Sequence, residues 1–146
     1  MELSEQAQSS SSLIGFVGEN MKINRLDHLV LTVADVEKSC QFYERALGMT
    51  IVTFGDDRKA LLFGQQKINL HQLGKEIKPN AKNANTGTGD LCFIADTDLK
   101  EVIQHLLSCN VQLESDIVER TGAIGKLRSI YLRDPDDNLI EISNYL

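Results

Sequence analysis

Alternating apolar and polar positions predict the first run of elements in this chain. Residues 26–33 place Leu29, Leu31 and Val33 on one side of a strand and polar or smaller residues on the other. Asp35 then suits a helix N-cap, and apolar residues recur at helical spacing until Gly48, a residue that commonly ends a helix. Three short strands follow at about 50–54, 59–63 and 67–73, separated by turn-forming residues.

The same order of elements returns after a polar linker at 74–88. A strand at 90–95 precedes a helix from Asp98 to about Asn110, and three strands follow at about 112–119, 127–132 and 139–143. An internal repeat of this kind predicts two βαβββ modules, neither of which buries its sheet alone.

The fold class expected from this repeat is α+β, with two paired βαβββ modules forming a curved mixed sheet around a cup-shaped cavity. We expect a single domain at residues 23–146, made of module 1 (about 25–73), the linker (74–88) and module 2 (about 89–146). Residues 1–22 are Ser-rich and lack a structural period, so a disordered leader is predicted there.

One polar residue interrupts the apolar pattern in the first and last strand of each predicted module. These residues are His28 and His71 in module 1, and Asp90 and Glu141 in module 2. Superimposing the first strands places His28 on Asp90, and superimposing the last strands without gaps places His71 on Glu141. Because strand side chains alternate, all four face away from the helices.

Two curved sheets side by side would gather these four side chains in one cavity. Imidazole nitrogen and carboxylate oxygen together suit a divalent Zn, Ni, Fe, Co or Mn ion. Each residue also has a simpler explanation: the histidines as core or rim residues, Asp90 as part of a turn, and Glu141 as the partner of an arginine. Four metal-competent residues at repeat-related positions favour the metal site over these explanations.

Composition and charge narrow the function classes. The net charge of −6 argues against binding to nucleic acid or to anionic membranes, which require clustered Lys and Arg. No apolar run approaches the length of a membrane span. The three cysteines are odd in number and lack CxxC spacing, which favours a reducing compartment, and we expect a cytoplasmic protein.

Three segments of the chain resemble the vicinal oxygen chelate superfamily: Asp27–Asp35, Phe42–Met49 and Asp134–Glu141. The resemblance covers about Ile23–Leu146, and within the superfamily the chain is similar to the glyoxalase I-like group of glyoxalase domain-containing proteins. It implies a paired βαβββ fold and a divalent metal held by residues from the first and last strands of each module.

Carried over by position, the resemblance implies that His28, His71, Asp90 and Glu141 bind the metal and that Glu141 is the catalytic base. The expected protein is a metal-dependent enzyme of the glyoxalase I type, a lyase or isomerase. It would act on a small substrate with two neighbouring oxygen atoms, through an enolate-type intermediate. Proteins of this fold often pair their modules between chains, so a homodimer is expected.

Three positions depart from the pattern of the family. Asp90 stands where the second module usually begins with a histidine, and Thr32 and Lys75 stand where glyoxalase I has its glutathione-binding Arg and Asn. The loss of a charged anchor argues against a glutathione adduct as substrate. Two alternatives stay open: a metal-free protein that binds a small ligand in the same cup, and an extradiol dioxygenase-like enzyme with Fe(II). The sequence also leaves open whether the cup closes within one chain or between two.

Overall fold

A computed structural model describes residues 20–146, so most of the predicted leader lies outside the described residues. Two helices and eight strands occupy the described part of the chain, in two four-stranded mixed sheets. The α+β architecture with two βαβββ modules, expected from the repeat, is confirmed.

Module 1 has the sheet order β1-β4-β3-β2, in which β1 and β4 are parallel. The structure bounds its elements as β1 (His28–Val33), α2 (Val36–Leu47), β2 (Thr50–Phe54), β3 (Arg58–Phe63) and β4 (Gln66–Gln72). Helix α2 begins and ends where the sequence predicts. The side chain of Asp35 accepts a hydrogen bond from the Lys38 amide, and Gly48 takes the left-handed conformation that closes a helix.

Module 2 repeats this arrangement with the order β5-β8-β7-β6. Its elements are β5 (Asp90–Ile94), α3 (Leu99–Ser108), β6 (Val118–Thr121), β7 (Lys126–Arg133) and β8 (Leu139–Tyr145). The strand predicted at 112–119 is wrong over most of its length. Only Leu113 forms a bridge to β7 before β6 begins at Val118, because the intervening Ser115 and Asp116 bend the chain.

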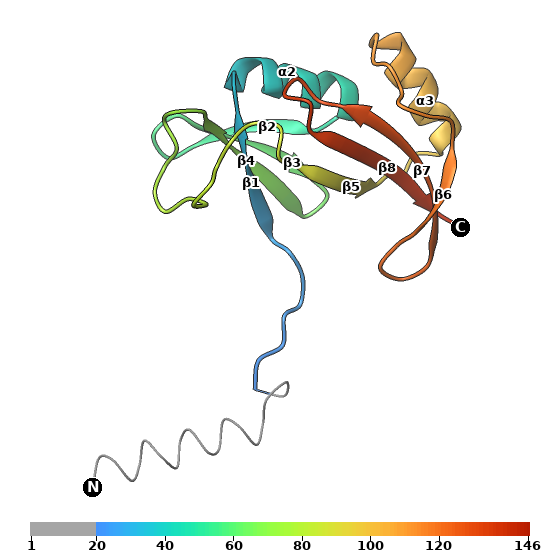
Figure 1. Ribbon diagram of the computed structural model, residues 1–146, viewed down its shortest axis with the longest axis horizontal. Coiled ribbons are helices and arrows are strands. Elements are labelled where there is room, and N and C mark those ends of the chain that lie inside the picture. Colours follow the sequence, from blue (N-terminus) through green and yellow to red (C-terminus); the bar gives the residue numbers. More distant parts are fainter. Residues whose placement is uncertain (1–19) are drawn as a thin grey trace, which may run out of the picture.

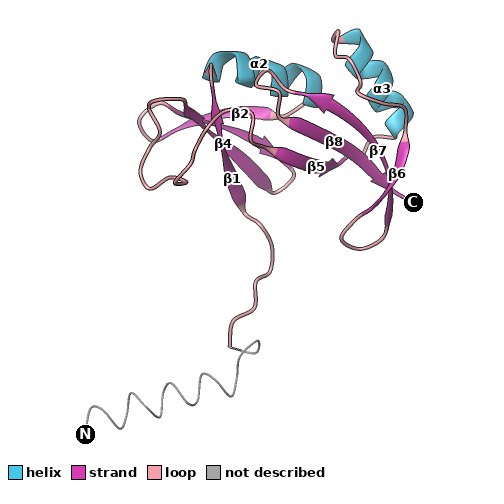
Figure 2. Cartoon of the chain, in the orientation of Figure 1, coloured by secondary structure: helices cyan, strands magenta, loops and turns pink. Residues whose placement is uncertain are grey.

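Both helices cover the same side of the two sheets (Figure 1). Apolar residues from both modules form one core beneath them, including Tyr43, Ile68, Leu106, Ile130 and Ile140. The other side of the sheets carries no helix in the described structure (Figure 2), and we call it the open face. Polar residues of the first and last strands lie on this open face.

A buried hydrogen-bond network joins the two modules at the turn between β7 and β8. The Tyr43 hydroxyl of α2 donates to Oδ2 of Asp134 at 2.6 Å, and both side chains are buried. Burial and the neighbouring carboxylate raise the pKa of Tyr43, so its hydroxyl stays protonated as a donor. Asp136 accepts from the Ala34 amide at 3.1 Å, and Asp137 takes a left-handed conformation within the turn.

Two further contacts tie the modules together on the helix side. Phe63 of β3 and Phe93 of β5 pack edge to face with their ring centres 5.2 Å apart. Nε2 of His105 on α3 lies 3.0 Å from the carbonyl oxygen of Arg45 at the end of α2. These contacts lie beside the cluster of buried apolar residues that the two modules share.

Candidate functional site

Asp90 and Glu141 lie on neighbouring parallel strands of module 2. Glu141 stands opposite Cys92 in the register of β5 and β8, while Asp90 stands opposite Leu139. Both carboxylates therefore point to the open face, two positions apart along the strands. Asp90 is exposed and Glu141 is half-buried, so each is accessible from the open face.

A short chain of hydroxyl groups lies beside Glu141. Oγ of Ser143 donates to Glu141 Oε2 at 3.3 Å and lies 2.6 Å from Oγ of the buried Ser129. Sγ of Cys92 is 3.4 Å from the same Ser143 oxygen. Burial raises the pKa of the Cys92 thiol, and a protonated thiol is a poor nucleophile. Asp90 and Glu141 are therefore the two accessible carboxylates of this half of the open face.

His28 and His71 lie on the open face of module 1. His28 is exposed, and its Nδ1 lies 2.8 Å from the Asp27 carboxylate. His71 stands opposite Thr32 in the β1–β4 register and is only 5% exposed. Neither ring nitrogen of His71 has a hydrogen-bond partner in the structure. Because a buried polar group without a partner is costly, the imidazole is suited to a bound ligand or ion.

The charge state of His71 follows from its surroundings. Burial lowers the pKa of His71, and the Arg58 guanidinium lowers it further, while the Glu76 carboxylate acts in the opposite direction. The ring is therefore neutral near pH 7. A neutral imidazole nitrogen can donate its lone pair to a metal or accept a hydrogen bond.

The strand register shows that the two superpositions made from the sequence, His28 on Asp90 and His71 on Glu141, differ by two residues. Val30 occupies in β1 the position that Cys92 has in β5, and it pairs with Asn69, whereas Cys92 pairs with Glu141. If His28 matches Asp90, the register matches Asn69 to Glu141; His71 matches Glu141 when the first strands are shifted by two residues, which places Thr32 on Cys92. Asn69 is 5% exposed, and its Oδ1 has no hydrogen-bond partner. His71 lies two residues further along, on the same face.

A small cavity of about 160 Å³ opens beside His71. The linker predicted at 74–88 folds over this end of the open face and supplies most of its walls. The lining residues are Val30, Leu31, Thr32, His71, Pro79, Asn80, Ala81, Asn83, Ala84, Asn85, Thr88 and Asn138. Because its polar side chains are amides, two threonine hydroxyls and the neutral imidazole, the cavity suits a small polar molecule.

The two halves of the predicted metal site do not meet within one chain. Across residues 20–146, no three side chains of the His, Cys, Asp and Glu types lie close enough together to hold a metal ion. Each module instead presents its own pair of donors on the open face. Their chemistry still fits a divalent metal, because the donors include a neutral imidazole with both nitrogens free and an unpaired amide oxygen.

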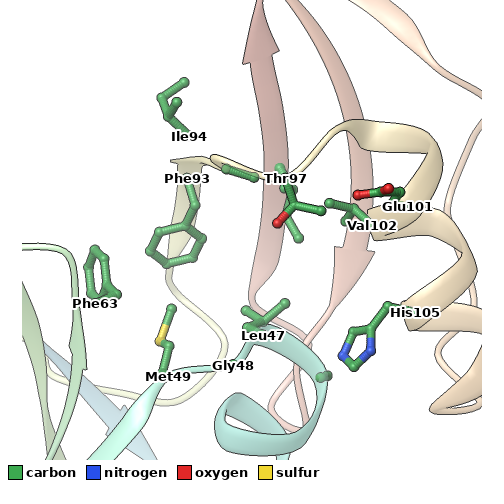
Figure 3. Close-up of a pocket in the computed structure, with 13 residues that line it drawn as sticks. Leu47, Gly48, Met49, Phe63, Phe93, Ile94, Thr97, Glu101, Val102 and His105 are labelled. Carbon is green, nitrogen blue, oxygen red and sulfur yellow. The ribbon is translucent and has the colours of Figure 1, made fainter.

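A larger cavity of about 310 Å³ lies on the helix side, between the two modules (Figure 3). Phe63, Phe93, Met49 and Leu47 project toward it, with Glu101 and His105 of α3 along one side. None of the four predicted site residues lines this cavity. Its walls are mainly apolar, so we interpret it as a packing gap between the modules and assign the chemistry to the open face.

Comparisons with known proteins agree with the fold. The model of the Glyoxalase/Bleomycin resistance protein/Dioxygenase superfamily matches residues 25–142. The chain belongs to this superfamily. Members of the superfamily typically use divalent metals, bind small-molecule substrates and are often dimers. The resemblance expected from the three sequence segments is thereby confirmed at the level of the superfamily.

The relatives within this superfamily differ in their names. Virulence protein STM3117 of Salmonella typhimurium is 52% identical over 126 residues, which span 86% of this chain and 88% of that protein. Its crystal structure gives a TM-score of 0.85 and covers 86% of this chain and 100% of its own. Glyoxalase domain-containing protein RDO1 of Mycosarcoma maydis is 50% identical over 86% of this chain and 70% of its own length. Metallothiol transferase FosB of Staphylococcus epidermidis is 30% identical over 84% of this chain and 82% of its own.

Sequence reasoning missed Asn69 and the covering of His71 by the segment at 74–88. Asn69 and His71 are two residues apart along β4 and share a face, so the face of Asn69 was predictable, but an amide is a weaker indication of a metal site than an imidazole or a carboxylate.

No helix in the described part of the chain is long and apolar enough to cross a lipid bilayer.

Proposed function

We propose that this protein is a metal-dependent enzyme of the glyoxalase I type that acts on a small molecule with two neighbouring oxygen atoms. The observation that carries the proposal is the repeated placement of donor pairs on the open face. His28 with the β4 donors in module 1 corresponds to Asp90 with Glu141 in module 2. The name metallothiol transferase, borne by a relative at 30% identity, also supports a metal.

The ligands of the metal would be His28, Asp90, Glu141 and His71, with Asn69 as a further donor on β4. When bound, a divalent metal acts as a Lewis acid that polarises the oxygen atoms of the substrate. Asp90 makes the donor set richer in oxygen than a set with histidine at that position, and such a set shifts preference toward harder metals.

Glu141 would act as the general base. Its carboxylate is half-buried on a central strand, which fixes its direction, and Ser143 donates to one of its oxygens. The carboxylate would take a proton from the carbon next to the substrate carbonyl and return it to the neighbouring carbon. The substrate would pass through an enolate-type oxyanion between these two transfers.

The active site would form between two copies of this chain. Each chain holds its donor pairs apart, so a complete set requires the open face of a second copy. Apolar side chains on the same face are left accessible: Val30, Leu62 and Ile94 are 44%, 38% and 50% exposed. Burying such residues favours association, and a homodimer would cover them.

The test is the metal content of protein purified without chelators or metal-affinity columns, measured by elemental mass spectrometry. We expect near-stoichiometric transition metal that falls severalfold in His28→Ala, His71→Ala and Glu141→Ala, because each change removes a ligand. The matched control is His105→Ala, which removes an imidazole on the helix side. Absence of metal in the parent, with no thermal stabilisation by added Zn, Ni, Co, Mn or Fe(II), would contradict the proposal and leave a metal-free binding cup.

A further inference from the structure

Two cations on the open face of module 1 converge on one aromatic ring. The guanidinium carbon of Arg58 lies 4.7 Å from the ring centre of Phe54, and Nζ of Lys67 lies 4.3 Å from the same centre. The three residues come from adjacent strands β2, β3 and β4. Cation–π attraction accounts for part of this arrangement, but two like charges beside one ring also repel each other.

No carboxylate of residues 20–146 is in contact with either cation: the Asp27 carboxylate, whose pKa is lowered by the hydrogen bond to His28 and also by Lys67, lies against His28 at 2.8 Å and is 72% exposed. Within the described residues, neither Arg58 nor Lys67 forms an ion pair, although three other ion pairs occur there. On the open face, His28 stands opposite Lys67 in the β1–β4 register, and Ala60 and Asn69 are buried neighbours on β3 and β4. The positive charge is therefore available to an anion from outside the chain.

The buried imidazole of His71 and the cavity that it lines lie on the same face as these cations. Arg58 begins β3 and His71 stands near the end of the neighbouring strand β4, on the same face; His71 lines the 160 Å³ cavity, and Arg58 lies outside its walls. His71 is 5% exposed, and both of its ring nitrogens lack partners. A ligand that fills this cavity and extends past His71 along the open face would reach the neighbouring strand that carries Arg58.

We propose that Arg58 and Lys67 bind the anionic end, a carboxylate or a phosphonate, of the substrate. Arginine suits both groups because its guanidinium offers paired donors to two oxygens, and lysine adds a point charge. The carboxylates Asp90 and Glu141 make module 2 unfavourable for that end, so the charge pattern also orients the substrate. This inference rests on the proposed function, because it gives the substrate of that site an acidic group.

The test uses three small probes of similar size: pyruvate, methylphosphonate and the uncharged hydroxyacetone. Each is titrated into 15N-labelled full-length protein, as purified and with its metal content measured, and binding is followed by amide chemical shifts. We expect both anions to bind at least tenfold more tightly than hydroxyacetone, with the largest shifts in β3 and β4. The tighter of the two anions identifies the acidic group that the site prefers.

Substitutions locate the charge that is responsible. Arg58→Gln and Lys67→Gln should each weaken the binding of the preferred anion about tenfold, since each removes one charged contact. The control is Lys59→Gln, which removes the same charge from β3 but on the helix-side face, where Lys59 bonds Thr53 and lies beside Asp57. Equal loss in all three variants, or no loss in Arg58→Gln and Lys67→Gln with a folded spectrum, would overturn the proposal.

The outcome separates this inference from the proposed function. Anion binding that depends on Arg58 and Lys67 in a protein without metal would support the anion site and count against the metal enzyme. Stoichiometric metal, together with anion binding that is unchanged in Arg58→Gln and Lys67→Gln, would support the metal enzyme and count against the anion site. Hydroxyacetone binding as tightly as pyruvate would also overturn the anion site, because charge would then not be recognised.

Discussion

Asp134 is a buried carboxylate whose two oxygens accept four hydrogen bonds. The donors are the Tyr43 hydroxyl, the amides of Asp136 and Asn138, and the side-chain amide of Asn138. Charge-assisted bonds of this kind offset the cost of burying the carboxylate. The sequence identifies the turn from its Asp, Pro and Asn residues, but not the partner from the first helix, because tertiary packing alone brings Tyr43 to it.

Removal of the Tyr43 hydroxyl should destabilise the fold. We expect Tyr43→Phe to lower the free energy of unfolding by about 1–3 kcal/mol, because a buried carboxylate oxygen loses a donor. Urea denaturation measures this change. Tyr131→Phe is the control, since its hydroxyl lies on a half-buried side chain beside Arg120. A loss in Tyr43→Phe no larger than in the control would show that the network contributes little.

The imidazole of His71 should titrate below its ordinary pKa of 6.5 in metal-free protein. Because the folded-state pKa is depressed, the unfolded chain binds more protons in the interval between the two values. Stability should therefore fall as the pH decreases from about 6.5 through that interval, and be unaffected by this group above it. NMR titration of the His71 ring gives the pKa, with His28 in the same spectrum for comparison. A pKa of His71 at or above 6.5 would contradict the structure.

At the scale of elements, the pattern of the sequence predicts nearly every helix and strand. Periodicity and capping residues set the bounds of α2 and place most strands within a residue or two. The match of His71 to Glu141 stays a prediction, because the match of His28 to Asp90 requires a register that differs from it by two residues. Side chains along a strand point to the same face at every second residue, so a shift of two residues from Asn69 to His71 keeps the side chain on the open face. Only the hydrogen-bond register, which depends on the whole sheet, separates the two positions.

Substitution of Gly87, with Gly64 as the control, tests how tightly the segment before β5 is held against module 2. Gly87 and Gly64 both have positive φ, at 68° and 52°. A Cβ at Gly87 would lie 2.8 Å from the carbonyl oxygen of Asp136, whereas a Cβ at Gly64 meets nothing within 4 Å. Gly64→Ala should cost about 1 kcal/mol for its backbone conformation. Gly87→Ala should cost clearly more in the same urea experiment, and equal costs would show that the Asp136 turn moves aside freely.

At the scale of the whole molecule, a site shared by two chains makes a prediction that a site within one chain does not. When His28→Ala and Glu141→Ala proteins are refolded together, mixed dimers should carry one site with both changes and one intact site. Random pairing then restores metal to about a quarter of all sites, although each variant alone binds little. Elemental analysis of the mixture measures the recovery. No recovery despite mixed dimers, detected by native mass spectrometry, would place all ligands of a site in one chain.

The contact between Tyr43 and Asp134 also bears on how the protein is made. These residues are 91 positions apart, and the hydroxyl of the first finds its partner only when the second has been synthesised. When only the first module has been synthesised, the Tyr43 hydroxyl of α2 thus has no Asp134 carboxylate to accept its hydrogen bond. Translation must pass Asp134 before the Tyr43 hydroxyl can find its partner, which couples the packing of the first helix to the synthesis of the second module.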